Sequence, residues 1–310
     1  MTPHLSRLLA ATALACATCL SMPAHAITSF DIEMDNNLGN VNGLAYRESD
    51  GHLLLTRDGF DWSPTVWSTP LLREYDSTGQ LVQTIELTTL MPGISVTEGA
   101  SSPASGGGLY LKTYTANEDW SEFTEQLMVL SPDLSSAAPW TPPIALGPQD
   151  RFSHVTDSEF ITFNSMNDTV KFTSLLTGET QTVSLAGHFG TEEGCLEGSC
   201  IASLAPSWSG GFFAVDDSGE NSRLMEFDRQ GNLLHTVLLD HTVFGYHPQA
   251  IDTDLSGRRI FLSMNNLTVL TFSEHDFLTA SIPEPATWAS MGLGLIALAG
   301  AAARTRRQRG

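Results

Sequence analysis

Residues 72–87 read LREYDSTGQLVQTIEL and residues 224–239 read LMEFDRQGNLLHTVLL, so the two segments align without a gap. Each consists of an apolar run, a D-x-x-G turn and a second, alternating run, which is typical of a β-hairpin. A degenerate third copy spans residues 170–185 and has Gly178 at its turn. The same hairpin at separate places in one chain indicates a fold built from repeated β-units.

A short apolar strand is the second repeated feature. Its central residues recur every 48 to 56 positions: Leu54, Tyr110, Ile161, Phe213 and Phe261. Repeats of this length with about four strands each are typical of a β-propeller, whose radial packing leaves only short edges. We therefore predict an all-β chain with five blades of about 51 residues. Six blades of about 43 residues, or a β-sandwich with chance similarity, are the alternatives. Closure of the ring would pair residues 27–34 with residues 267–272.

The first hundred residues add a resemblance to a known family. The segments GLAYRESDGHLLLTRDG (43–59) and LREYDSTGQLVQTIEL (72–87), with Glu98-Gly99 after them, resemble the NHL-like propellers of the SdiA-regulated and phytase-like esterase type. The shared pattern records blade geometry more than chemistry. The resemblance implies a propeller and adds little about activity.

The C-terminal residues 281–310, SIPEPATWASMGLGLIALAGAAARTRRQRG, have three parts. Pro283, Glu284 and Pro285 come first, and the prolines hold Glu284 in an extended, exposed conformation. Residues 286–303 contain no charge, and as a helix they would be about 27 Å long, enough to span a thin membrane. Trp288 would anchor this helix at the interface, and the arginines that follow favour a cytoplasmic C-terminus. These arginines are Arg304, Arg306, Arg307 and Arg309.

This tail resembles the PEP-CTERM sorting signal of Gram-negative bacteria, through residues 283–288, the apolar helix and the terminal arginines. The resemblance implies recognition by an exosortase, an integral-membrane cysteine transpeptidase, and removal of the tail. The protein would then pass to the cell surface or to an exopolysaccharide matrix. A simple membrane anchor is the alternative, but an anchor does not need Pro-Glu-Pro.

The N-terminus has the features of an export signal. Arg7 precedes an apolar stretch at residues 8–20, and Ala24-His25-Ala26 forms an A-x-A cleavage site. We predict a signal peptide at 1–26, a propeller body at 27–282 and a sorting signal at 283–310. A lipoprotein signal ending at Cys16 is the alternative, but it lacks the usual Leu three residues before the cysteine.

The predicted body is strongly acidic. It keeps 10 of the 15 Lys and Arg residues and 34 of the 35 Asp and Glu residues, a formal charge near −24. Such a surface argues against a nucleic-acid partner and disfavours adsorption to anionic lipid. The acidic surface is compatible with the binding of divalent cations or simply with high solubility. Cys195 and Cys200 remain after export, and we expect them to form a disulfide in the oxidising periplasm.

No catalytic motif of a hydrolase, metalloprotease or nucleotide-binding enzyme occurs in the chain. Carboxylates near the ends of the repeated strands are the remaining candidates for chemistry, namely Asp58, Asp61, Glu98, Asp216 and Asp217. Strand ends line one mouth of a propeller channel, so Asp58, Glu98 and Asp216 could together hold Ca²⁺. The alternative is that they are solvated turn residues.

Aromatic side chains offer a second candidate surface. Trp62, Trp67 and Trp120 are of the kind that carbohydrate-binding surfaces use, but we favour the alternative that they cap the core between blades. The histidines of the body are scattered, and we expect each to be an ordinary surface or turn residue: His154, His188, His241 and His247.

The sequence therefore predicts an exported propeller that leaves the periplasm for the cell surface or matrix. We expect a binding or structural module without catalysis, with an exosortase and an exopolysaccharide as partners. A calcium-dependent hydrolase of the phytase- or lactonase-like type is the first alternative. A structural coat or biofilm component without a ligand is the second.

Overall fold

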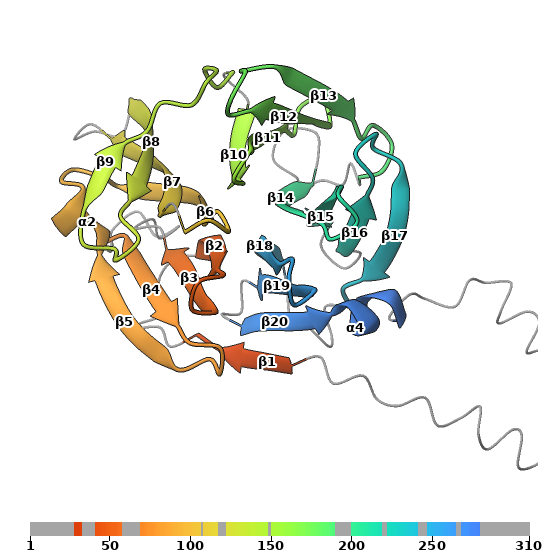
Figure 1. The fold of residues 1–310 in the computed structure, drawn as a ribbon, viewed down its shortest axis with the longest axis horizontal. Helices are drawn as coiled ribbons and strands as arrows, with labels where there is room; N and C mark the ends of the chain where they lie inside the picture. The colour runs from red at the N-terminus through yellow and green to blue at the C-terminus, as the bar shows by residue number, and fades with distance from the viewer. Residues whose placement is uncertain are drawn as a thin grey trace, which may run out of the picture.

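The computed structural model describes residues 28–32, 41–57, 69–106, 108–116, 122–147, 150–189, 200–218, 222–240, 247–264 and 268–279. In these ranges the chain forms five four-stranded sheets, which are arranged as blades around a central axis (Figure 1). The molecule is a five-bladed β-propeller, which confirms the predicted fold class and blade number. The alternatives of six blades and of a β-sandwich are wrong.

The strands of each blade follow one another from the axis outwards (Figure 1). The first blade contains β2 (Val41–Arg47), β3 (His52–Arg57), β4 (Leu71–Tyr75) and β5 (Leu81–Glu86); the second contains β6 (Val96–Ser101), β7 (Leu109–Ala116), β8 (Phe123–Leu130) and β9 (Ala137–Pro139). The third contains β10 (Asp150–Val155), β11 (Glu159–Asn164), β12 (Thr169–Ser174) and β13 (Thr180–Ser184); the fourth contains β14 (Ile201–Pro206), β15 (Phe212–Asp216), β16 (Arg223–Phe227) and β17 (Leu233–Leu238). The fifth contains β18 (Pro248–Asp254), β19 (Arg259–Met264), β20 (Thr268–Ser273) and, outermost, β1 (Thr28–Asp31).

The ring is closed by β1, which is the outer strand of the last blade although it comes first in the chain. It pairs antiparallel with β20, with Thr28 opposite Thr271 and Asp31 opposite Thr268. This is the closing pair that the sequence predicted. Because both ends of the body share one sheet, the ring cannot open without breaking backbone hydrogen bonds.

The repeated apolar strands are the second strands of the five blades, β3, β7, β11, β15 and β19. In β3, β15 and β19 almost every residue is buried, because a neighbouring blade covers each face of the sheet, whereas the C-terminal end of β7 is partly exposed. Outer strands such as β5 are mostly exposed. The core is accordingly divided into five clusters, one between each pair of adjacent blades.

The two matching hairpins, β4–β5 and β16–β17, have the same turn. In both turns, a glycine backbone N–H donates a hydrogen bond to the backbone carbonyl of the aspartate three residues earlier: Gly79 to Asp76 and Gly231 to Asp228. Each aspartate side chain also accepts backbone N–H groups of the turn. Both glycines have a left-handed φ, +82° and +86°, which glycine adopts without steric cost. The D-x-x-G pattern is therefore explained by turn geometry.

Every inner strand contains a β-bulge opposite the second strand of its blade, a feature that the sequence did not reveal. The bulges lie between the residue pairs Val41/Gly43, Glu98/Ala100, Phe152/His154, Ile201/Ser203 and Pro248/Ala250. A bulge increases the local twist of a strand. Because the bulge recurs in all five blades, we infer that this extra twist helps the inner strands to pack around the central axis.

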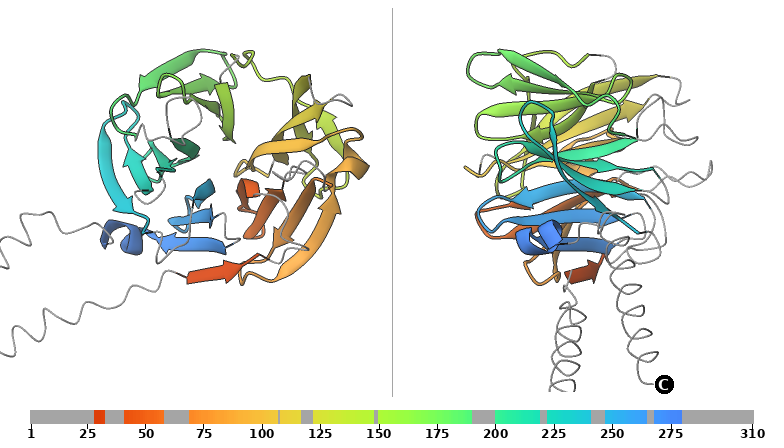
Figure 2. Two further views of the ribbon diagram at one scale, coloured as in Figure 1. Left: turned by 180° about the vertical axis from the view of Figure 1, so that it is seen from behind. Right: turned by 90° about the vertical axis from the view of Figure 1, so that its right-hand side faces the viewer.

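The strand directions define two faces of the ring. On one face, here called the turn face, the first strand of each blade turns into the second, and in the first four blades the third strand turns into the fourth. The short helix α4 (Glu274–Thr279) follows β20 on the turn face, and β1 begins there. Figure 2 shows β1 and α4 near each other at the outer edge of the ring. The helix α2 (Leu87–Leu90) follows β5 on the opposite face.

Candidate functional site

Several predicted site residues lie outside the described residues, so they stay predictions. They are the sorting residues Pro283, Glu284 and Pro285, the tail residues Trp288, Arg304, Arg306, Arg307 and Arg309, the signal-cleavage residues Ala24 and Ala26, and also Asp58, Asp61, Trp62, Trp67, Trp120, Cys195 and His241. In the part of the chain that the structure describes, no helix is long and apolar enough to cross a membrane. Cys200 is buried and disulfide-bonded, and its pairing with Cys195 remains a prediction.

Glu98, the first described member of the predicted calcium site, lies near the start of β6 on the face opposite the turn face. Its carboxylate is 3.2 Å from Lys112 Nζ and 3.8 Å from Arg151 Nε. It also accepts a short hydrogen bond from the Tyr114 hydroxyl. Burial, together with the charge of Glu98, raises the pKa of Tyr114, so this hydroxyl remains a donor. Two cations and one donor therefore surround the Glu98 carboxylate.

Asp216, the second described member, ends β15 on the same face and is fully buried. Its carboxylate accepts hydrogen bonds from Ser218 and from the Arg223 guanidinium, whose Nε lies 2.9 Å away. The neighbouring Asp217 has an oxygen 2.8 Å from His247 Nδ1. Burial raises the pKa of Asp217, although His247 opposes the shift. Among the residues that the structure describes, neither Glu98 nor Asp216 belongs to a group of three metal-ligand side chains.

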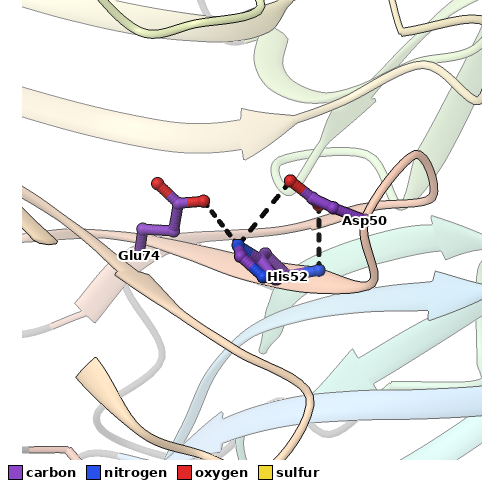
Figure 3. Close-up of side chains that lie close together, drawn as sticks. All are labelled: Asp50, His52 and Glu74. Atoms are coloured by element: carbon purple, nitrogen blue, oxygen red, sulfur yellow. Dashed lines mark hydrogen bonds and ion pairs between the residues drawn. The ribbon is translucent and has the colours of Figure 1, made fainter. Parts of the chain in front are cut away.

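The structure instead brings together Asp50, His52 and Glu74 on the turn face of the first blade (Figure 3). His52 Nδ1 lies 2.5 Å from Glu74 Oε1 and 3.6 Å from Asp50 Oδ2. Asp50 lies in the turn after β2, His52 begins β3 and Glu74 is buried on β4. Sequence reasoning missed this group because strand pairing joins residues that are 22 positions apart. In the sequence, nothing sets Glu74 apart from other strand glutamates.

An arginine already occupies the position of a cation in this cluster. The Arg47 guanidinium contacts both the Asp50 and Glu74 carboxylates. Burial alone would raise the pKa of Glu74, but hydrogen bonds from Gln83 and His52 and the charge of Arg47 hold that pKa below its ordinary value. A metal ion would have to displace the guanidinium, so we interpret the cluster as an ion-pair network that fixes the turn.

A second unpredicted feature lies at the axis of the ring. His154 on β10 and Asp252 on β18 come from inner strands that are not neighbours, yet His154 Nε2 is 3.5 Å from Asp252 Oδ1. The backbone N–H groups of Tyr46 and Thr253 donate to the Asp252 carboxylate, each over 2.7 Å. Both side chains are buried, so side chains fill the channel at this level.

The surroundings of this pair suppress its charges. Burial lowers the pKa of His154 to about 3 and raises that of Asp252 well above its ordinary value. The expectation that His154 is a surface or turn residue is therefore wrong, because an inner strand directs it into the channel. His188 is half-buried against Phe227, and His247 is exposed, as the sequence suggested.

Comparison with known proteins identifies the tail. Residues 281–307 match the PEP-CTERM protein-sorting motif. No curated protein matches the sequence. Solved structures with a similar course of the chain include the nidogen/laminin complex, at 14% identity over 76% of this chain and 80% of that one, with a TM-score of 0.41. They also include a streptogramin B lyase, at 12% identity over 80% and 87% of the two chains, with a TM-score of 0.41. Virginiamycin B lyase from Staphylococcus aureus is 9% identical over 84% and 75%, with a TM-score of 0.34.

These structural likenesses are too weak to say anything about a ligand or an activity. The tail match is of a different kind, because it concerns a defined signal with a defined receptor. The chain carries a PEP-CTERM protein-sorting motif, which marks it as a protein exported to the cell envelope and as a substrate for recognition by an exosortase.

Proposed function

We propose that this protein is a surface or matrix propeller that an exosortase-type transpeptidase releases from its membrane tail. The signal peptide at 1–26 would be removed during export, and residues 286–303 would hold the precursor in the membrane until processing. The body at 27–282 would then pass from the periplasm to the cell surface or the exopolysaccharide matrix. The observation that carries this proposal is the sorting motif at 281–307, which directly follows a closed propeller.

The ring itself would serve as a binding or structural module. A calcium-dependent hydrolase would need free carboxylates at the channel mouth, but Glu98 already has Lys112 and Arg151 as partners. Asp216 likewise has Arg223. This internal pairing supports a role without catalysis. The acidic body would favour a ligand that is neutral or carries bound cations, such as a polysaccharide, over a polyanion.

Mass spectrometry of the mature C-terminus tests the sorting mechanism. The full-length protein would be purified from cells with and without their exosortase. We expect loss of everything beyond the region of Pro283, Glu284 and Pro285 only when the enzyme is present. A Glu284→Ala variant should remain uncut, whereas an Arg309→Ala variant, altered only in the tail cluster, should still be processed. An intact Gly310 in both strains would mean a plain membrane anchor and would refute the proposal.

The role of the ring requires a separate measurement. Binding of the mature body to an array of the cell's own polysaccharide fragments should give signals that survive 0.5 M salt, if neutral sugars are the ligand. An array without any signal would leave the structural coat as the role of the ring.

A further inference from the structure

The helix α4 is the last described element before the sorting motif, and it is fixed to the ring by several independent contacts. Its Phe277 is fully buried and packs edge-on against Phe213, Trp208 and His235 of the fourth blade. His235 Nε2 is also 3.0 Å from the Phe277 carbonyl oxygen. These contacts place α4 over the turn-face end of the interface between the fourth and fifth blades.

Further bonds stabilise α4 itself and attach its start to the ring. At its start, the Asp276 carboxylate accepts hydrogen bonds from the backbone and the hydroxyl of Ser273, and the Ser273 hydroxyl accepts the Asp276 N–H, which is a capping box. The Arg258 guanidinium pairs with Glu274 over 2.7 Å. At the other end, the Thr279 hydroxyl donates to the His275 carbonyl. The ion pair of Glu274 and the contacts of Phe277 therefore hold the helix to the ring, and Thr279 lies two residues beyond the last of these contacts.

Only residues 280–282 separate α4 from Pro283. Even fully extended, the chain from Thr279 to Pro283 spans at most about 14 Å. From Thr279 to Ala286, where the predicted membrane segment begins, it spans at most about 25 Å. The part of the turn face that carries α4 must therefore lie within this distance of the membrane, and of an enzyme embedded in it, while the tail is uncut.

The surface around α4 has the character of a contact surface. Two leucines that border it are exposed: Leu278 on the helix (47%) and Leu255 (39%), in the turn that supplies Arg258. Leu233 and Leu234 lie beside His235 and are also exposed. Exposed apolar side chains near one element can contribute to a protein or membrane contact. The formal charge of the body, near −24, disfavours anionic lipid and leaves a protein as the partner.

We propose that the turn face around α4 is the surface that the membrane-embedded transpeptidase meets, and that α4 acts as a rigid spacer which presents the sorting motif from that face. This inference rests on the proposed function. It adds that recognition involves the folded ring as well as the tail, and that the orientation of the ring is set by the short connection between Thr279 and Pro283.

Site-specific photo-crosslinking of the full-length precursor tests this inference. An exosortase without its catalytic cysteine would hold the uncut precursor in cells. A photoreactive amino acid would replace Leu278 or Leu255. The control carries the same amino acid in place of Met166, which is also exposed (53%) and lies in the loop between β11 and β12 on the opposite face. We expect crosslinks to the enzyme at least fivefold stronger from positions 278 and 255 than from 166.

Two further variants test the spacer. Insertion of twelve Gly and Ser residues after Thr279 should reduce the crosslink from position 255 to the level of position 166, while an active enzyme still cuts the tail. Phe277→Ala, which frees α4, should have the same effect. Equal crosslinking from 166 and 278, crosslinks to lipid alone, or a signal at 255 that the insertion leaves unchanged would each overturn the inference. A tail that no strain cuts would instead refute the proposed function, so the two failures are distinguishable.

Discussion

Replacing Gly231 by alanine tests how the repeated hairpin turns join one blade to the next. Gly231 has a φ of +86°, and a Cβ atom there would lie 2.6 Å from Val183 Cγ1 and 3.0 Å from the Ser184 carbonyl oxygen. Both neighbours belong to β13, the outer strand of the preceding blade. Val183 is buried and β-branched, so its methyl group cannot rotate away freely.

Gly210 provides a matched control, because its φ is +85° but a Cβ atom there would have no neighbouring atom within 4 Å. Alanine in this conformation costs about 1–2 kcal/mol at either site. At position 231, the forced overpacking adds about 1–3 kcal/mol. We therefore expect the free energy of unfolding to fall by about 2–5 kcal/mol for Gly231→Ala and by about 1–2 kcal/mol for Gly210→Ala.

Urea unfolding of the mature protein, followed by tryptophan fluorescence and by circular dichroism, measures both losses. Coincident transitions would justify the two-state comparison. Equal losses for the two variants would refute the reasoning, because they would mean that the turn does not contact the neighbouring blade.

Three further predictions concern other parts of the ring. Phe277→Ala should lower the free energy of unfolding by about 3–5 kcal/mol, since it removes a fully buried ring, and a loss below 1 kcal/mol in urea unfolding would contradict the packing of α4. In the wild type, His154 and Asp252 have opposite effects on how stability depends on pH. Between about pH 3 and 6.5 His154 binds fewer protons in the folded protein than in the unfolded chain, whereas above about pH 3.8 Asp252 binds more, so the two effects oppose each other. Asp252→Asn leaves a histidine of depressed pKa, and stability should fall by about 1.4 kcal/mol per pH unit from 6.5 towards 3. His154→Asn leaves an aspartate of raised pKa, so stability should fall as the pH rises above 3.8; urea midpoints with the same pH slope in both variants would disprove this coupling. Millimolar calcium should leave the thermal midpoint unchanged, because Glu98 and Asp216 have internal cation partners, and an increase that Glu98→Gln abolishes would instead support the hydrolase.

The sequence by itself determined the repeated architecture of this protein and the signal that directs its sorting. The apolar second strands at Leu54, Tyr110, Ile161, Phe213 and Phe261 can be recognised in the sequence, because a strand covered on both faces is predominantly apolar. The D-x-x-G turns are visible because a left-handed turn position selects glycine. The sorting signal is likewise a contiguous motif, and residues 281–307 match it without any tertiary structure.

Only the tertiary structure decided which polar groups meet. His154 and Asp252 are almost a hundred residues apart and come together across the axis because five blades place their inner strands around one channel. Pairing of β3 with β4 brings His52 to Glu74, and Arg47 from β2 forms an ion pair with the Glu74 carboxylate. Glu98 and Asp216 looked like free ligands in the sequence, but Lys112 and Arg223 reach them from neighbouring strands. Periodicity reports burial along one strand, whereas the partner of a charge depends on the register and packing of several, which no single stretch of sequence contains.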